Sequence, residues 1–225
     1  MKKLVLLSGG VDSTTCLAMM IKDHGKENVI ALNIYYGQKH IKEIQCARNI
    51  AKYYGIQLEE FDLKSIMESS DCPLLQSSGK EIIHESYAEQ LAKKTGTVDT
   101  YVPFRNGLML SIATTRALIN GCDEVCYGAH SDDACGSAYP DCTPQFYEGM
   151  NKAIYEGSGQ KVTLYAPILN LTKADVVKIG LELKVPYELT WSCYEGGETP
   201  CHTCGTCIDR ENAFKKNGVI DPLCR

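Results

Sequence analysis

The chain has 225 residues, 44% of them hydrophobic, and a formal net charge of −5. This length accommodates one large α/β domain, or such a domain with an appendage. The acidic balance argues against a protein that grips nucleic acid, which usually carries a basic face, so we expect small-molecule partners and no nucleic acid. The apolar run at residues 4–7 is too short for a signal sequence, and no stretch reaches the ~18 apolar residues of a membrane span. We therefore expect a cytoplasmic protein without membrane contact.

Short β-rich runs alternate with helical segments along the first half of the chain. Strands are expected over residues 3–7, 29–36, 57–63 and 124–129. Helices are expected over residues 13–22, 41–54 and 106–119, the second of them ending at Gly55. Strands that alternate with helices indicate an α/β fold with a Rossmann-like parallel sheet flanked by helices.

Residues 64–100 depart from this pattern because they are polar and rich in serine and glycine breakers. A short helix is expected over residues 86–94. We interpret the segment as an insertion, most simply a surface excursion, with a lid or an oligomer contact as the alternative. The chain then divides into an α/β domain at residues 1–185 and a small C-terminal segment at residues 186–225.

The string SGGVDS, residues 8–13, lies between the first expected strand and the first expected helix. Paired glycines let the backbone turn tightly, so that several N–H groups can point at one anion. Asp12 and Ser13 are good helix N-cap residues, and a helix start adds partial positive charge. The string therefore favours a phosphate cradle, although glycine content alone is equally typical of an ordinary turn. It matches neither the Walker A pattern nor G-x-G-x-x-G.

Two cations are expected at the starts of later helices. Arg105 precedes Asn106, a plausible N-cap, and Lys173 lies inside the capping-box pattern of Thr172 and Asp175. A cation near a helix N-terminus is electrostatically unfavourable unless an anion binds there. Both positions therefore indicate anion contacts, with a solvated surface side chain as the alternative.

Four of the twelve cysteines form a cluster, namely Cys193, Cys201, Cys204 and Cys207. Four thiolates with no open position are typical of a structural zinc ion. An iron–sulfur cluster and a redox Cys-x-x-Cys pair are the alternatives, and His202 is a competing ligand whose spacing fits less well. In a cytosolic protein, clustered cysteines more often bind metal than form disulfides.

Taken together, the motifs resemble a known family. SGGVDS is similar to the pyrophosphate loop of the N-type ATP pyrophosphatases. The stretches TWSCYEGG, PCHTCGTCIDR and GAHSDDACGSAYPDC, with SGGVDSTTCL, VPFRN and LTKADVV, resemble the 7-cyano-7-deazaguanine synthases in order and over nearly the whole length. The resemblance implies an adenine nucleotide alpha-hydrolase-like fold with a C-terminal zinc-binding segment.

The resemblance also implies a reaction. An ATP-dependent carbon–nitrogen ligase would convert 7-carboxy-7-deazaguanine and ammonia to 7-cyano-7-deazaguanine through an adenylated carboxylate and an adenylated amide, releasing AMP and diphosphate. One structural Zn²⁺ per chain, Mg²⁺ and a homodimer are expected. The rival within the superfamily is a tRNA-thiolating enzyme, which would need a catalytic cysteine.

Residue roles follow from the same resemblance. Lys173, Arg105 and Asp12 are the expected catalytic residues. Residues 128–142 and Trp191 are the expected base-lining candidates, and either Asp132 or Asp133 is the functional acid. Cys142 is expected to be structural or substrate-lining. ATP is expected to contact the loop and helix start formed by Leu7, Ser8, Gly9, Gly10, Val11, Asp12, Ser13, Thr14, Thr15, Cys16 and Leu17.

Overall fold

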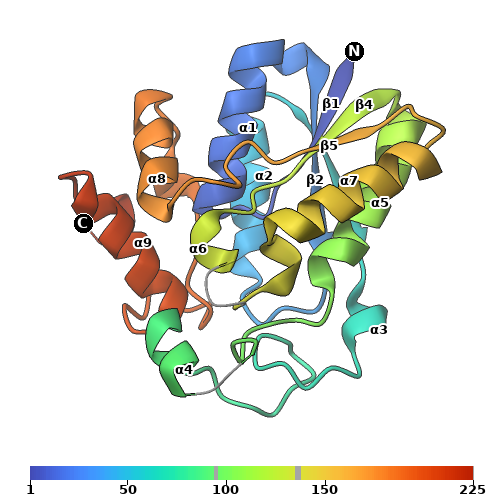
Figure 1. Cartoon of the computed structure of the whole chain (residues 1–225). Coiled ribbons are helices and arrows are strands. Elements are labelled where there is room, and N and C mark those ends of the chain that lie inside the picture. Colours follow the sequence, from blue (N-terminus) through green and yellow to red (C-terminus); the bar gives the residue numbers. More distant parts are fainter. Residues whose placement is uncertain (94–95, 135–137, 225) are drawn as a thin grey trace.

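The protein is built around a five-stranded sheet in which every pair of neighbouring strands is parallel. The structure, a computed structural model, describes residues 1–93, 96–134 and 138–224. The strand order is β3-β2-β1-β4-β5 (Figure 1). The strands are β1 (Lys2–Leu6), β2 (Val29–Tyr35), β3 (Gln57–Asp62), β4 (Cys122–Cys126) and β5 (Thr163–Tyr165). The expected parallel α/β fold is confirmed, with β5 as an additional edge strand.

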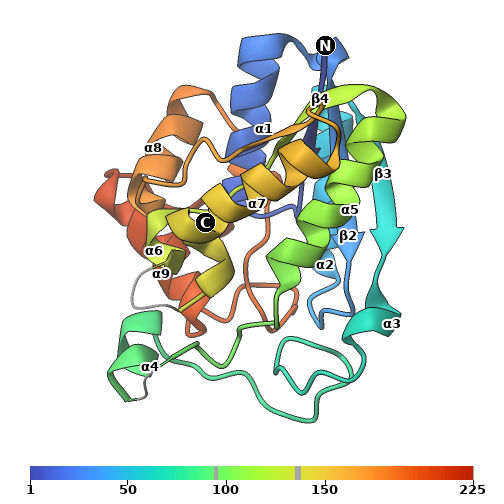
Figure 2. The same ribbon diagram turned by 45° about the vertical axis from the view of Figure 1, so that its right-hand side comes forward.

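Helices cover both faces of the sheet. Helices α1 and α2 lie on one face, and α5 and α7 lie on the other (Figures 1 and 2). The long helices are α1 (Val11–His24), α2 (Lys42–Tyr54), α5 (Arg105–Asn120), α7 (Pro144–Gly157), α8 (Lys173–Glu182) and α9 (Gly205–Lys216). The short ones are α3 (Lys64–Met67), α4 (Tyr87–Lys93) and α6 (Ser131–Ala134). No helix in the described ranges combines the length and the apolar character that a membrane crossing needs.

The core lies where the interior strands are covered on both faces. All but the last residue of β2 are buried, as expected for a nearly continuous apolar run between two helical layers. Leu4 of β1 lies opposite Ile30 of β2 and Val125 of β4, and all three side chains are buried. The interior strands are thereby fixed in register, and their carboxyl ends meet at one edge of the sheet.

Two helix starts differ from the expected ones. Helix α1 begins at Val11 with Gly10 as its N-cap, so neither Asp12 nor Ser13 caps it. Helix α5 begins at Arg105, and Asn106 lies in its first turn. The backbone N–H of Asn106 donates to Oδ2 of the buried Asp141 at 2.9 Å, so a residue from a distant loop supplies the missing acceptor.

Helix α8 begins as the sequence predicts. The Thr172 hydroxyl accepts from the Asp175 N–H, and the Asp175 carboxylate accepts from the Thr172 N–H, which completes a capping box. This motif needs only neighbouring residues, and it fixes the position of Lys173 in the first turn.

The insertion and the C-terminal segment pack against each other and against the sheet domain. Leu74 and Leu75 are buried, so the insertion contributes to the core and is more than a surface excursion. The hydroxyls of Tyr87 in α4 and Tyr194 lie 2.7 Å apart, and Figure 1 shows α4 beside α9. The expected helix at 86–94 is present as α4, and its last expected residue lies outside the described ranges.

Candidate active site and metal centre

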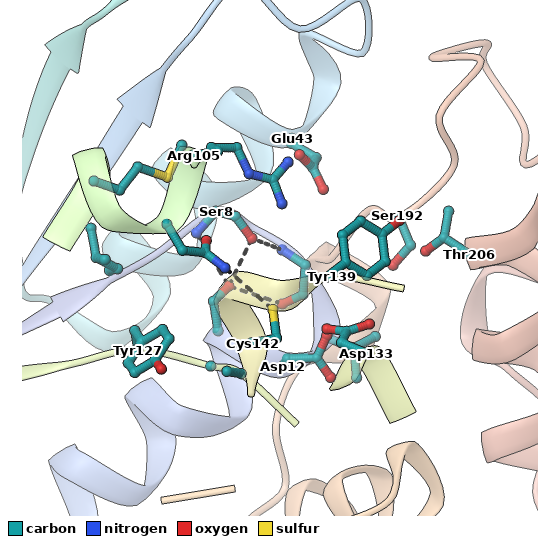
Figure 3. A pocket seen from close by; sticks show the side chains of 18 of the residues that line it. Ser8, Asp12, Glu43, Arg105, Tyr127, Asp133, Tyr139, Cys142, Ser192 and Thr206 are labelled. Carbon is teal, nitrogen blue, oxygen red and sulfur yellow. Dashed lines mark hydrogen bonds between the residues drawn. The ribbon is translucent and has the colours of Figure 1, made fainter. Parts of the chain in front are cut away.

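A cavity of about 240 Å³ opens at the carboxyl ends of β1, β2 and β4. This is the edge at which open α/β sheets bind their ligands. Figure 3 shows side chains from the loop after β1, from α2, from α5 and from the loop after β4 converging on it. The lining includes Ser8, Asp12, Ser13, Tyr36, His40, Glu43, Arg105, Tyr127, His130, Asp133, Tyr139, Cys142, Lys173, Ser192, Tyr194 and Asp209.

The loop after β1 forms one wall of the cavity. Gly9 has φ +97°, and a Cβ there would lie 2.3 Å from the carbonyl oxygen of Glu43, so only glycine fits. The N–H groups in the first turn of α1 have no partner within the helix. The Ser8 and Ser13 hydroxyls lie 3.0 Å apart beside them. This wall therefore offers clustered donors for an anion.

The expected ATP-contacting residues divide into two groups. Leu7, Ser8, Gly10, Val11, Asp12 and Ser13 line the cavity. Gly9, Thr14, Thr15, Cys16 and Leu17 lie outside the lining. The Thr14 hydroxyl donates to the Gly10 carbonyl at 2.6 Å, and Cys16 and Leu17 are fully buried. Gly9 is part of the loop itself, and the other four residues of the second group belong to α1, which follows the loop.

Lys173 and Asp12 meet in the same cavity. The Lys173 ammonium contacts Oδ2 of Asp12, and Nε2 of His130 lies 3.8 Å from Oδ1 of Asp12 and 3.4 Å from Oδ2 of Asp133. Burial alone would raise the pKa of the Asp12 carboxyl, but Lys173 and His130 hold that pKa below its usual value. Asp12 is therefore an ionised, partly buried carboxylate on the anion-binding wall.

The two adjacent aspartates have different positions. Asp133 lines the cavity and pairs with His130. Asp132 accepts a hydrogen bond from the backbone N–H of Lys173 at 2.8 Å, so it supports the start of α8. Of the two, Asp133 is placed to contact a ligand.

Arg105 also reaches the cavity from the start of α5. Its Nη1 donates to the Tyr36 hydroxyl at 3.0 Å, and its guanidinium lies over the Tyr36 ring at 5.2 Å. Burial alone would lower the pKa of Arg105, but Tyr36 and Asp141 raise it above the usual value, so the guanidinium stays charged. In the described part of the chain no carboxylate forms an ion pair with it.

Several cavity residues were not foreseen from the sequence. Nε2 of the buried His40 lies 3.0 Å from Oε2 of Glu43. A Cβ on Gly10 would lie 3.8 Å from Oε1 of Glu43, so this carboxylate stands close to the anion-binding loop. Tyr36 and Tyr194 add aromatic surface. The available signal was their position, since His40 lies in the connection after the carboxyl end of β2 and Glu43 lies in the first turn of α2.

Unpaired polar atoms gather at this cavity. Seven buried side-chain nitrogen or oxygen atoms among the described residues lack a hydrogen-bond partner. Four of them belong to cavity residues: Asp12 Oδ1, His40 Nδ1, Tyr127 OH and His130 Nδ1. Because unpaired buried polar atoms are costly, their concentration here indicates a polar ligand.

The four clustered cysteines form a second centre. The Sγ atoms of Cys193, Cys201, Cys204 and Cys207 all lie within 4.8 Å of one another. Sγ atoms on one tetrahedral ion are roughly 3.8 Å apart, given the Zn–S bond length. The backbone N–H groups of Cys201 and Cys204 donate to Sγ of Cys193 and Cys201, both at 3.3 Å. The cluster has the geometry to bind a metal ion.

Comparison with known proteins decides the family. The family model described as "Queuosine biosynthesis protein QueC" matches residues 2–218. The chain is 44% identical to a 7-cyano-7-deazaguanine synthase of Archaeoglobus fulgidus, covering 99% of this chain and 90% of the relative. It is 38% identical to one of Oceanobacillus iheyensis, covering 99% and 97%. The chain belongs to the 7-cyano-7-deazaguanine synthase family.

A solved structure from outside the synthases has a similar fold. The U34-tRNA thiolase NcsA from Methanococcus maripaludis, with its [4Fe-4S] cluster, superposes with a TM-score of 0.54. The similarity covers 96% of this chain and 67% of that one, at 17% sequence identity. At this identity the thiolase supports the fold assignment alone.

The structure shows where Cys142 and Trp191 lie relative to the cavity. Cys142 lines the cavity, and Nδ2 of Asn106 lies 3.3 Å from its Sγ. Burial raises the pKa of the Cys142 thiol well above its usual range, which disfavours the thiolate. Trp191 is buried outside the lining beneath Lys42, whereas Ser192 and Tyr194 line the cavity, so the prediction of Trp191 as a lining residue was wrong. Residues 135–137 of the predicted 128–142 lining stretch lie outside the described ranges.

Proposed function

We propose that the chain converts 7-carboxy-7-deazaguanine and ammonia to 7-cyano-7-deazaguanine at the expense of ATP. The family assignment supports the reaction. The observation that locates the reaction within the structure is that Lys173, Asp12 and the first turn of α1 meet at one cavity. Fixed donors and a partly buried cation stabilise charge that develops on diphosphate as it leaves.

ATP would place its phosphates on the loop at residues 8–13. Leu6 at the end of β1 and Leu32 opposite it in β2 supply apolar surface for the adenine, and the Asn33 side-chain amide donates from β2 to the Leu7 carbonyl at 2.7 Å. Mg²⁺ prefers carboxylate oxygens, and Asp12, Glu43 and Asp133 line this wall. When bound there, Mg²⁺ would neutralise charge on the leaving diphosphate.

The acid substrate would lie beside Arg105 and the tyrosines. Tyr36, Tyr139 and Tyr194 offer aromatic surface to a planar base. Arg105 is a permanent cation that can hold a carboxylate or a phosphate oxygen in a fixed orientation. These assignments support a site in which the carboxylate and the α-phosphorus of ATP approach each other.

The chemistry needs no protein nucleophile. A carboxylate oxygen of the substrate attacks the α-phosphorus, and diphosphate leaves. Ammonia then adds to the acyl carbon, loses a proton and displaces AMP, giving the amide. The amide oxygen attacks the α-phosphorus of a second ATP and releases diphosphate, and loss of AMP and of both protons on the amide nitrogen then leaves the nitrile. Asp12, Lys173 and Arg105 position the reactants and stabilise charge.

Zn²⁺ would occupy the four-cysteine cluster as a structural ion. Closed thiolate sets of this kind contribute directly to folding. The thiolase relative carries an iron–sulfur cluster, so the identity of the metal is a separate measurement.

We also propose that residues 1–185 and 186–225 fold together in a cytoplasmic homodimer, with no nucleic-acid partner.

The deciding experiment supplies zinc-replete protein with Mg-ATP, ammonium and 7-carboxy-7-deazaguanine, and identifies the products by mass spectrometry. AMP together with the nitrile is the expected result. Amide without nitrile would assign the chain to amide ligases instead. Absence of AMP from folded protein would reject the proposal and favour a thiolase, which would bind tRNA tightly in a salt-sensitive complex.

A further inference from the structure

A second group of metal-ligating side chains lies beside the four-cysteine cluster and has no part in the proposed reaction. His202, Glu211 and Cys224 each present one ligand atom, and the three atoms lie within 4.8 Å of one another. Nδ1 of His202 is 2.6 Å from Oε1 of Glu211 and 4.0 Å from Sγ of Cys224. Ligand atoms on one tetrahedral zinc ion lie roughly 3.3–3.7 Å apart, given typical bond lengths. The separation between His202 and Glu211 is shorter than this range, and the separation between His202 and Cys224 is longer.

The backbone of His202 has an uncommon conformation. His202 has φ 62°, a left-handed conformation that is uncommon for a residue other than glycine. It is fixed there between Cys201 and Cys204 of the metal centre. Its ring therefore leaves the cluster and faces Glu211 on α9.

The other two ligands are anchored by a buried ion pair. Arg210 donates through Nε and Nη2 to the two carboxylate oxygens of Asp221, at 2.6 and 2.9 Å. Both side chains are 3% exposed. Arg210 adjoins Glu211, and the Cys224 N–H donates to the Asp221 carbonyl at 2.9 Å. One bidentate contact thus sets the distance between Glu211 and Cys224.

We propose that His202, Glu211 and Cys224 bind a second divalent transition-metal ion, of the zinc class, on the surface of the C-terminal segment. One imidazole, one carboxylate and one thiolate suit Zn²⁺ or Co²⁺ far better than Mg²⁺ or Ca²⁺. Three protein ligands leave one position for water, in contrast to the closed set of four cysteines. His202 thereby ligates this separate ion, and the four cysteines bind theirs without it.

The test uses full-length protein purified with its first metal ion and then titrated with Co²⁺ alone. Wild-type protein should bind one further ion per chain, with a thiolate-to-cobalt absorption band and a matching mass increase in native mass spectrometry. His202→Asn and Cys224→Ser should each weaken this second binding more than about tenfold. The matched control His24→Asn should bind like wild type.

Two results would overturn the inference. One is saturation of the wild type at a single ion per chain. The other is loss of the first ion in Cys224→Ser, which would make Cys224 part of the four-cysteine centre. All three ligand side chains are exposed or half-exposed, so the variants should keep the melting temperature of the wild type, and that measurement separates lost binding from lost folding.

Discussion

Lys173 and Asp12 lie 161 positions apart in the sequence, and the Lys173 ammonium contacts Oδ2 of Asp12 in the folded chain. Each is in the first turn of its helix, Asp12 in α1 and Lys173 in α8. An acid suits that location and a lysine does not, so the pair combines a favourable and an unfavourable charge. An incoming phosphate would compete with Asp12 for the ammonium.

Replacing Lys173 with alanine should lower AMP formation by roughly 10²–10³-fold, because a preorganised cation at the departing diphosphate is lost. Lys178→Ala, an exposed lysine on the same helix, is the control and should retain activity. Initial rates of AMP release measure both. A Lys173→Ala enzyme as fast as the control would remove Lys173 from the mechanism.

Arg105→Ala should reduce kcat/KM for AMP formation at least about tenfold, and Arg105→Lys should recover little, because lysine lacks the planar fork of guanidinium. Arg116→Ala, at the other end of α5 and paired with Glu59, should change the rate less than twofold. Steady-state kinetics with varied 7-carboxy-7-deazaguanine would check this. Full recovery by lysine would mean that charge alone is required.

Cys142→Ser should keep activity within about tenfold of wild type, since the thiol is buried with a raised pKa and the proposed steps use no nucleophile. Product rates and intact-protein mass during turnover provide the measurement. If a folded Cys142→Ser protein is inactive and wild type shows a covalent adduct, the thiolase-type alternative gains support.

Asp209→Asn should stabilise the ligand-free protein near neutral pH. Burial raises the pKa of Asp209 to about 6, so the folded state holds this proton more tightly than the unfolded state does. The stabilisation from the proton is present at low pH and is lost as pH rises through about 6, leaving a penalty of about 1–3 kcal/mol at pH 7.5. The melting-temperature advantage of Asp209→Asn should grow between about pH 4 and 6 and then level off. An advantage independent of pH would contradict the assignment.

Cys204→Ser should abolish stoichiometric zinc and lower the melting temperature strongly, because the cluster supplies folding energy to the C-terminal segment. Elemental analysis, including iron and sulfide, identifies the metal. Cys46→Ser, away from the cluster, should keep one zinc per chain at the cysteines. Iron and sulfide in place of zinc would instead support the iron–sulfur alternative.

The sequence predicted the features that depend on neighbouring residues. The capping box at Thr172, the helix stop at Gly55 and the apolar run of β2 are local, and each is present in the structure. Helix α7 and the three-residue strand β5 were not predicted. Strand β5 is too short to carry a periodic pattern, and it lies at the sheet edge.

The parts of the site that were not predicted depend on tertiary contacts. Asp141 provides the acceptor at the start of α5 from a separate loop, which no local motif encodes. Glu43 and Tyr194 reach one cavity only because α2 and the C-terminal segment both pack at the same sheet edge. The family motifs identified Lys173 and the loop at residues 8–13, whereas the shape of the cavity required the fold.

The C-terminal segment holds the phosphate loop directly. The Trp191 N–H donates to the Gly9 carbonyl at 3.0 Å, and the Tyr187 and Thr15 hydroxyls lie 2.8 Å apart. During synthesis the ribosome releases residues 9–15 long before residues 187–191. The contacts that support the proposed nucleotide-binding wall therefore form only near the end of translation. A nascent chain stalled before residue 187 should not bind ATP.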